Sequence, residues 1–309
     1  MLYGNCFTTE FLDQVEQRIM TDDVPSAMEE LMSGLWWRRS RSSKKSWSKF
    51  ISEEVQNHRL LEILQEDPIT EHALRQPRGY PGDADLLDHM YFGMEKKQLE
   101  GISRRGQEIF YFIYFDPAYR AVRTRMRVIA EKIDEISDQF PARILSIACG
   151  HLREATHSQA ITKRRIRQFV ALDQDPESLN RVERELSKYG VTIVQKSIKD
   201  LILKDENLGK FDLIYSTGLY DYLSDKAAKL LTKKLFSSLK PEGTLLIANA
   251  LPDIHASGYM EAFMNWHLIY RNDGEMYRLL ELLNQNEYSA STFKEPNGQI
   301  VFLEVCKFS

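Results

Sequence analysis

The sequence predicts an α/β fold: a seven-stranded sheet with an antiparallel last strand, preceded by an all-helical N-terminal domain. Three observations support this prediction. Apolar residues recur at helical spacing over residues 1–137. From Pro141 onward, short apolar runs alternate with helical stretches. Near the end, Pro296-Asn297-Gly298 separates two further apolar runs, which is typical of a β-hairpin.

The N-terminal domain is expected to span residues 1–137 and to be helical. Phe11, Val15 and Ile19, for example, fall on one face of a helix. A stretch rich in proline and glycine, residues 77–91, interrupts this pattern. It is either a plain turn or a lid that folds over a ligand, with Tyr80 reaching in.

The second domain is expected over residues 138–309. Right-handed crossovers between successive strands would give a parallel sheet, closed by the antiparallel hairpin. An aromatic and polar stretch, residues 252–275, reads as a cap insertion over the pocket. The predicted strands are 143–148, 167–172, 191–195, 211–216, 244–249, 289–293 and 300–308.

The stretch RILSIACGHLRE, residues 143–154, is the most informative part of the chain. A β-branched apolar run ends in a small-residue turn at Gly150, where the backbone can approach a ligand closely. About twenty residues later a second apolar run ends in Asp173, where a carboxylate can accept hydrogen bonds from ribose hydroxyls. Together the two elements predict a nucleoside pocket.

The number of glycines limits which nucleoside ligands the pocket could bind. A dinucleotide fingerprint needs three glycines around a pyrophosphate, and only Gly150 is present here. No strand is followed by the Gly-Lys-Ser/Thr of a phosphate-binding loop. A ligand with an adenosine and no phosphate fits better, and S-adenosylmethionine is the commonest such cofactor.

The order of these motifs resembles the class I S-adenosylmethionine-dependent methyltransferases, which have a Rossmann-like sheet. The resemblance covers residues 141–309 and rests on RILSIACGH, FVALDQD, FDLIYSTGLYDYL and LKPEGTLLIAN. One departure is Ser146, which stands where the family often has an acidic residue, so the methionine amino group needs another partner. In addition, PRGYPGDADLLDHMY (77–91) and WHLIYR (266–271) resemble a bacterial group, the 3-hydroxypalmitic acid methyl ester biosynthesis proteins.

The resemblance implies a set of cofactor-binding residues. Asp173 would bind the ribose, and Gly150 would admit the methionine part. Cys149 lines the same turn as a small apolar residue, with a nucleophile as the alternative. Asp175 would lie at the edge of the adenosine; because a proline follows it, it could equally cap the start of a helix. The residues expected around the cofactor are Ala148, Cys149, Gly150, Asp173, Gln174, Ser197, Ile198, Ser216 and Gly218.

The acceptor side is expected to draw on the segments after the fourth and fifth strands. Arg271 could form a bidentate fork with a substrate carboxylate, which needs no base to attack a methyl group. An amine or phenol would need one, and His255 or His267 would supply it. The residues expected to act in catalysis are Tyr220, His255, His267 and Arg271, and those expected to bind substrate are Tyr80, Tyr222, Asn249, Trp266 and Tyr270.

Composition limits the other partners. The net charge of −4 gives no general attraction to nucleic acid. Residues 36–49 form a basic, Trp-rich run, which reads as a solvated loop between helices with Trp anchors in the core, and contact with nucleic acid or anionic lipid is the alternative. The three cysteines are too scattered for a disulfide framework or a zinc site, and no metal is expected. No apolar run approaches a membrane span, and no signal peptide is apparent. We therefore expect a cytoplasmic protein.

The leading hypothesis is a methyltransferase that acts on a small molecule, a fatty or other carboxylic acid, to give a methyl ester. An O- or N-methyltransferase of a natural product is the alternative. A regulatory protein that binds a nucleoside without turnover is a third hypothesis, and the glycine count disfavours an oxidoreductase. The acceptor and a homodimer are left open by the sequence.

Overall fold

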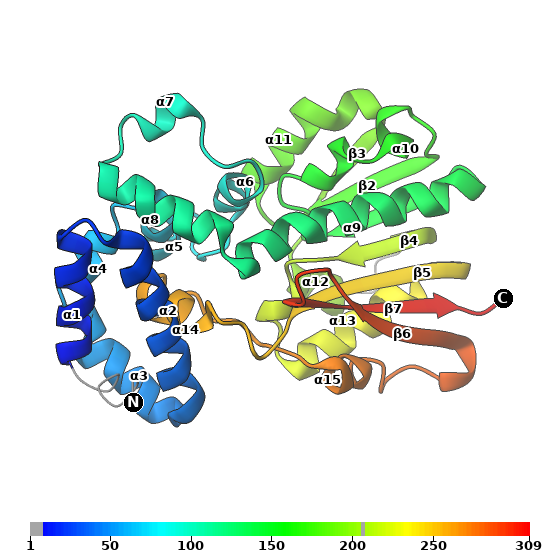
Figure 1. Cartoon of the computed structure of the whole chain (residues 1–309). Helices are drawn as coiled ribbons and strands as arrows, with labels where there is room; N and C mark the ends of the chain where they lie inside the picture. Colours follow the sequence, from blue (N-terminus) through cyan, green and yellow to red (C-terminus); the bar gives the residue numbers. More distant parts are fainter. Residues whose placement is uncertain (1–8, 205–207) are drawn as a thin grey trace. The chain divides into compact units, whose positions relative to one another are not determined.

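A computed structural model describes residues 9–204 and 208–309 (Figure 1). By their internal contacts these residues form two compact units. The helical unit comprises the described residues up to Arg120 together with Asp253–His267, and the sheet unit comprises Ala121–Pro252 and Leu268–Ser309. This division differs from the boundary expected at residues 137 and 138, and it assigns most of the expected cap insertion to the helical unit.

The sheet unit contains seven strands in the order β3-β2-β1-β4-β5-β7-β6. Strands β1 to β5 are parallel, and β7 lies antiparallel between β5 and β6. The predicted Rossmann-like fold with an antiparallel last strand is therefore confirmed. The strands are β1 (Arg143–Ile147), β2 (Gln168–Asp173), β3 (Val191–Gln195), β4 (Phe211–Ser216), β5 (Leu239–Ala250), β6 (Tyr288–Lys294) and β7 (Ile300–Lys307).

One strand is longer than expected. Strand β5 begins at Leu239, which pairs with Phe211, and pairing resumes at Thr244 opposite Leu213 after an irregularity. The sequence between these two pairs contains a proline and a glycine, which read as a turn. Because the backbone keeps the direction of the strand through this irregularity, the prediction placed the strand start five residues too late.

Helices cover both faces of the sheet, as alternation along the strands requires. In β2, Phe169 and Ala171 pack into the core on one face, while Val170 and Leu172 pack into the core on the other. The first face is covered by α9 (Pro117–Gln139), α10 (Gln159–Thr162) and α11 (Pro176–Leu186), and the second by α12 (Ile198–Leu203), α13 (Asp225–Ser237) and α15 (Asp273–Arg278).

The helical unit is built of short helices that pack closely. A Cβ atom on Gly258 would lie 2.7 Å from the backbone of Leu35, so glycine allows α14 to approach α2. Both α2 and α3 also meet α14 through Glu261, which accepts from Arg39 and from the indole of Trp47. The helices are α1 (Thr9–Met20), α2 (Val24–Arg41), α3 (Lys44–Glu53), α4 (Leu60–Leu64), α5 (Pro68–Arg75), α6 (Ala84–Phe92), α7 (Lys96–Leu99), α8 (Arg104–Phe115) and α14 (Ser257–Phe263).

The prediction of a loop over residues 36–49 is wrong, because only two residues separate α2 from α3. The run is basic but its side chains have internal partners: Arg38 stacks on the ring of Phe50, and Trp47 is buried. None of the helices in residues 9–204 and 208–309 combines the length and apolar character that crossing a bilayer requires.

Candidate cofactor-binding site

The order of the strands locates the candidate site. Strands β1 and β4 are neighbours, and the chain winds outward from them in opposite directions, to β2 and β3 on one side and to β5 on the other. Ligands of open parallel sheets bind beside the carboxyl ends of the strands at this switch point. The turns after β1, β2 and β4 are therefore the first place to look for a binding site.

The turn after β1 has an unusual backbone. Ala148 and Gly150 both adopt positive φ, 54° and 52° respectively. A side chain in this left-handed region costs about 1 kcal/mol or more, which glycine avoids. The amide of Cys149 donates to the carbonyl of Leu172 at 3.1 Å and so anchors the turn to β2. This holds the backbone of the turn at the carboxyl edge of the sheet, as predicted for Gly150.

Asp173 joins the ends of β2 and β1. Its Oδ2 accepts from the amide of Gly150 at 2.8 Å, and its Oδ1 accepts from the amide of Asp175 at 2.9 Å. The side chain is buried, and burial raises its pKa, while the amide hydrogen bonds oppose that rise. A carboxylate has about four acceptor sites, so these contacts leave capacity for ligand hydroxyls.

The residues that follow β2 and β3 have local roles. Asp175 caps α11 with Pro176 at its first turn, which confirms the alternative considered for this pair. Gln174 is exposed. Ser197 caps α12 by accepting from the amide of Asp200 at 3.1 Å, and Ile198 packs partly against the core of the second face. The predicted contacts of Gln174, Ser197 and Ile198 with the cofactor stay proposals.

The environment of Cys149 opposes a nucleophilic role. Burial, and then the negative charges of Asp173 and Glu154, raise the pKa of the thiol well above its usual range. The thiol is therefore protonated at neutral pH. This agrees with the interpretation of Cys149 as a small apolar residue of the turn.

The turn after β4 is tied to β1 and to α9. The hydroxyl of Ser216 donates to the carbonyl of Ile147 at 3.1 Å, which ties β4 to β1. Arg125 of α9 was missed by the sequence analysis. Its Nη1 donates to the carbonyl of Thr217, and its guanidinium lies about 4 Å from where a Cβ of Gly218 would be. No motif marks Arg125, because it is only one of several arginines along α9.

Glu154 is a second residue that the sequence analysis missed. It lies in a short 3-10 helix, η2 (Arg153–Thr156), and its side chain is buried. The hydroxyl of Tyr215 in β4 donates to its Oε1 at 2.7 Å, and Tyr215 also hydrogen-bonds Ser146. The one available signal was Ser146 itself, since a missing acidic residue in the strand implies an acidic group elsewhere.

Three predicted acceptor-side residues, Arg271, Tyr220 and Asn249, meet in a network at the end of β5. Nη1 of Arg271 donates to the carbonyl of Tyr220 and to Oδ1 of Asn249, and Nη2 donates to the carbonyl of Leu223 and to Asp225, all within 2.9 Å. Arg271 is 2% exposed. With both terminal nitrogens engaged, this arrangement does not support a fork between Arg271 and a substrate carboxylate.

The other members of the network are also bound internally. The hydroxyl of Tyr220 hydrogen-bonds Thr232, and the amide of Asn249 donates to the carbonyls of Ala250 and Ile269. Burial raises the pKa of Tyr220 beyond its ordinary range. These contacts give Tyr220 and Asn249 a structural role, whereas Tyr222 is 38% exposed.

The remaining predicted residues are divided between the two units. Tyr270 is half-buried in the sheet unit. Four others belong to the helical unit, so their roles as lid, base or substrate contact stay predictions: Tyr80, His255, Trp266 and His267. Within that unit Nε2 of His255 hydrogen-bonds the hydroxyl of Ser33 at 3.2 Å, Trp266 is buried and His267 is exposed.

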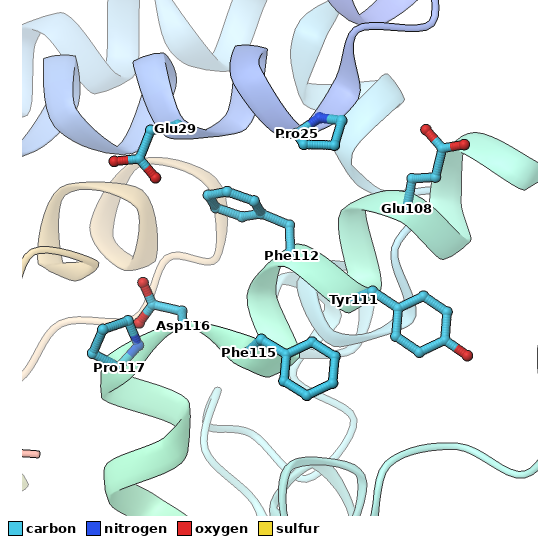
Figure 2. A pocket seen from close by; sticks show the side chains of 8 residues that line it. All are labelled: Pro25, Glu29, Glu108, Tyr111, Phe112, Phe115, Asp116 and Pro117. Atoms are coloured by element: carbon cyan, nitrogen blue, oxygen red, sulfur yellow. The ribbon is translucent and has the colours of Figure 1, made fainter.

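A pocket of about 480 Å³ lies within the helical unit (Figure 2). Its side chains come from α2, α8 and the start of α9. Two of its carboxylates have structural partners: Asp116 accepts from the amide of Ala118, and Glu108 pairs with Arg104. We therefore assign it no chemistry. It is lined by Pro25, Glu29, Glu108, Tyr111, Phe112, Phe115, Asp116 and Pro117.

Asp13, Glu16 and His58 place ligand atoms within 4.8 Å of one another. Nδ1 of His58 accepts from the amide of Leu60, so the ring proton is on Nε2, which donates to Asp13 at 3.1 Å. A nitrogen that carries a proton cannot bind a metal ion. These hydrogen bonds account for the cluster.

Comparisons with known proteins agree with the fold. A solved structure from Bordetella parapertussis, a "possible exported protein", is 17% identical, covers 86% of this chain and 99% of its own, and has a TM-score of 0.61. Magnesium protoporphyrin IX methyltransferase from Synechocystis PCC 6803 (11% identity, 61% and 86% coverage, TM-score 0.46) and a Burkholderia thailandensis didemethyltoxoflavin N1-methyltransferase (15%, 60% and 79%, 0.42) resemble it less. The last two similarities are too weak to add to the argument.

None of the curated proteins matches the sequence significantly. Residues 144–243 match a family described as a methyltransferase domain. The matched range begins in β1 and ends in β5, and so contains Gly150, Glu154 and Asp173. This match supports S-adenosylmethionine as the cofactor that the sequence predicts.

Proposed function

We propose that this protein is an S-adenosylmethionine-dependent methyltransferase of a small molecule. The observation that carries the proposal is the link between Asp173 and the amide of Gly150, inside the matched domain. This link sets a carboxylate with spare acceptor capacity beside a turn with positive φ. That arrangement suits an adenosine ligand without phosphates, as the single glycine of the motif already indicates.

The residues of the site would bind and orient rather than exchange protons. Asp173 would accept from the ribose hydroxyls, and the turn at Gly150 would contact the methionine part. When bound, the cofactor supplies a methyl group on a positively charged sulfur, which an acceptor atom attacks directly. Holding two reactants in line can supply several kcal/mol of the barrier reduction, so no strong base is required for an anionic acceptor.

For the acceptor we propose a fatty or other carboxylic acid, converted to its methyl ester. The support is the resemblance of residues 77–91 and 266–271 to the methyl ester biosynthesis proteins. Arg271 would act as a positioning residue below the site, not as the carboxylate fork. The cytoplasmic location, the bacterial source, a homodimer and the absence of a nucleic-acid partner stay predictions.

The test has two stages. Calorimetry with S-adenosylmethionine and S-adenosylhomocysteine measures binding, and then labelled cofactor is incubated with 3-hydroxy fatty acids, amines and phenols in parallel. A labelled ester supports the proposal. Labelled amine or phenol would overturn the acceptor class and keep the methyltransferase. Binding without turnover on any acceptor would favour the regulatory hypothesis, and no binding at all would refute the function.

A further inference from the structure

Glu154 carries a carboxylate that is buried near the switch point of the sheet. The residue is 8% exposed. Its Oε1 accepts one hydrogen bond, from the hydroxyl of Tyr215 at 2.7 Å. Among the residues that the structure describes, no side chain forms an ion pair with it. The backbone amide of Glu154 itself also donates to the carboxylate. Burying a carboxylate in this state is costly, because hydrogen bonds from neutral groups replace only part of its lost hydration.

The electrostatics of Glu154 confirm that cost. Burial raises the pKa of its carboxyl group. The hydrogen bonds from Tyr215 and from its own backbone amide, and the charges of Arg125 and His157, only partly oppose the rise. A ligand that brought a positive charge to this carboxylate would relieve the penalty. Unpaired buried charges of this kind are found at functional sites more often than elsewhere.

The position of Glu154 identifies which charge it would meet. Tyr215 in β4 is the register partner of Ser146 in β1, so its hydroxyl bridges the two central strands to Glu154. Asp173 accepts from the amide of Gly150, and Glu154 follows Gly150 by four residues, so both carboxylates belong to the same part of the candidate site. Asp173 would bind the ribose in the proposed function. The positive charges of the cofactor lie on its methionine end, which is the part left for Glu154.

We infer that Glu154 binds the α-ammonium group of the cofactor's methionine, in place of the acidic residue that Ser146 replaces. This inference rests on the proposed function. Arg125 supplies the complementary charge, because it is 7% exposed, lies at the turn after β4 and acts electrostatically on Glu154. A carboxylate and a guanidinium at one site have the charges that complement the ammonium and carboxylate of an amino acid.

The experiment compares two ligands that differ in the amino acid. S-adenosylhomocysteine carries the α-ammonium group, and 5′-methylthioadenosine has the same adenosine and thioether without it. In Glu154→Gln we expect the affinity for S-adenosylhomocysteine to fall tenfold or more, as for a lost charged hydrogen bond, at about 1.4 kcal/mol per factor of ten. Affinity for 5′-methylthioadenosine should stay within about twofold. Calorimetry measures both, and Glu183→Gln on the exposed side of α11 is the matched control.

The other possible results would overturn either this inference or the proposed function. Equal loss for both ligands would make Glu154 a structural residue and overturn the inference, as would unchanged affinity for both. Should Glu154→Gln not fold, Tyr215→Phe replaces it, with a smaller loss expected for S-adenosylhomocysteine alone. The wild type adds a pH test: its affinity for S-adenosylhomocysteine should rise with pH as Glu154 ionises. If the wild type binds neither ligand, the proposed function has failed rather than this inference.

Discussion

Two groups of buried polar residues lie at the carboxyl ends of the parallel strands. They differ in how many of their donors and acceptors have partners within the protein. At the end of β5, Arg271 donates to four acceptors of the protein, and Asn249 uses both ends of its amide. Near the ends of β1 and β2, Asp173 keeps spare acceptor capacity, and no side chain of the described residues forms an ion pair with Glu154. The first group supports the fold, and the second is available to a ligand.

This difference shows why position alone is a poor guide to function. Polar residues at the ends of parallel strands are good candidates for a binding site. Whether a particular residue belongs to the site depends on how many of its donors and acceptors already have partners within the protein. By that criterion Arg271 is a structural residue instead of a substrate ligand, and Glu154 becomes a candidate for the site.

The largest effect is expected from Arg271→Met. The substitution leaves the carbonyls of Tyr220 and Leu223 and the side chain of Asn249 without their buried donor, and should lower the free energy of unfolding by about 3–5 kcal/mol. Urea denaturation measures this. Arg278→Met removes an exposed arginine that pairs with Glu275 and should cost less than about 1 kcal/mol.

A stable Arg271→Met variant with lost turnover would break the comparison, since it would place Arg271 in the acceptor site. The structural role requires the opposite combination. The variant should be unstable but should bind S-adenosylhomocysteine with unchanged affinity at low temperature, where it is still folded.

The next effect is a pH dependence from Asp221 in the same network. Burial raises its pKa to about 6, and the amide of Ala250, which donates to Oδ1 at 2.7 Å, only partly offsets this. The folded protein therefore holds the proton more tightly than the unfolded chain. The resulting stability is fully present below pH ~4 and is lost as the pH rises to about 6, on the order of 2–3 kcal/mol.

Asp221→Asn should remove this loss. We expect the variant to gain stability relative to the wild type between pH 4 and pH 7.5, as measured by urea denaturation at several pH values. Asparagine keeps an oxygen to accept from Ala250. If the difference in stability between the two proteins does not change with pH, burial does not raise the pKa of Asp221 in the folded protein.

The smallest effect is expected from Asp173→Asn at the end of β2, which should weaken the free energy of ligand binding by about 2 kcal/mol. An amide offers one oxygen where the carboxylate offers two, so the link to Gly150 or the link to Asp175 is lost. Affinity should fall roughly thirtyfold for S-adenosylhomocysteine and equally for 5′-methylthioadenosine, since both carry the ribose. Calorimetry measures both affinities, with Asp200→Asn on α12 as control. Unchanged affinity for both would remove Asp173 from the site.

The sequence predicts most of the sheet because the signals of its strands are local. The apolar runs, the turn at Gly150 and the position of Asp173 depend on a few neighbouring residues, and the structure has them where expected. The partners of Arg271 are not local, since they lie 22 to 51 residues away in the chain. Arg125 and Glu154 likewise acquire their meaning only when the ends of β1 and β4 are brought together.

The helical unit shows the same limit. Helical periodicity over residues 1–137 is local and is borne out over its described part, but the internal partners of the basic run depend on α14, more than 200 residues away. Without Glu261 and Phe50 in view, a run of arginines and tryptophans reads as a solvated surface.

The raised pKa of the Cys149 thiol has a protective consequence. A thiolate at this turn would be the strongest nucleophile near an activated methyl group and would consume it in self-alkylation. Burial, followed by the negative charges of Asp173 and Glu154, keeps the sulfur protonated and slow to react. In the proposed function, the two carboxylates that would bind the methyl donor would therefore also protect it from reaction with the thiol.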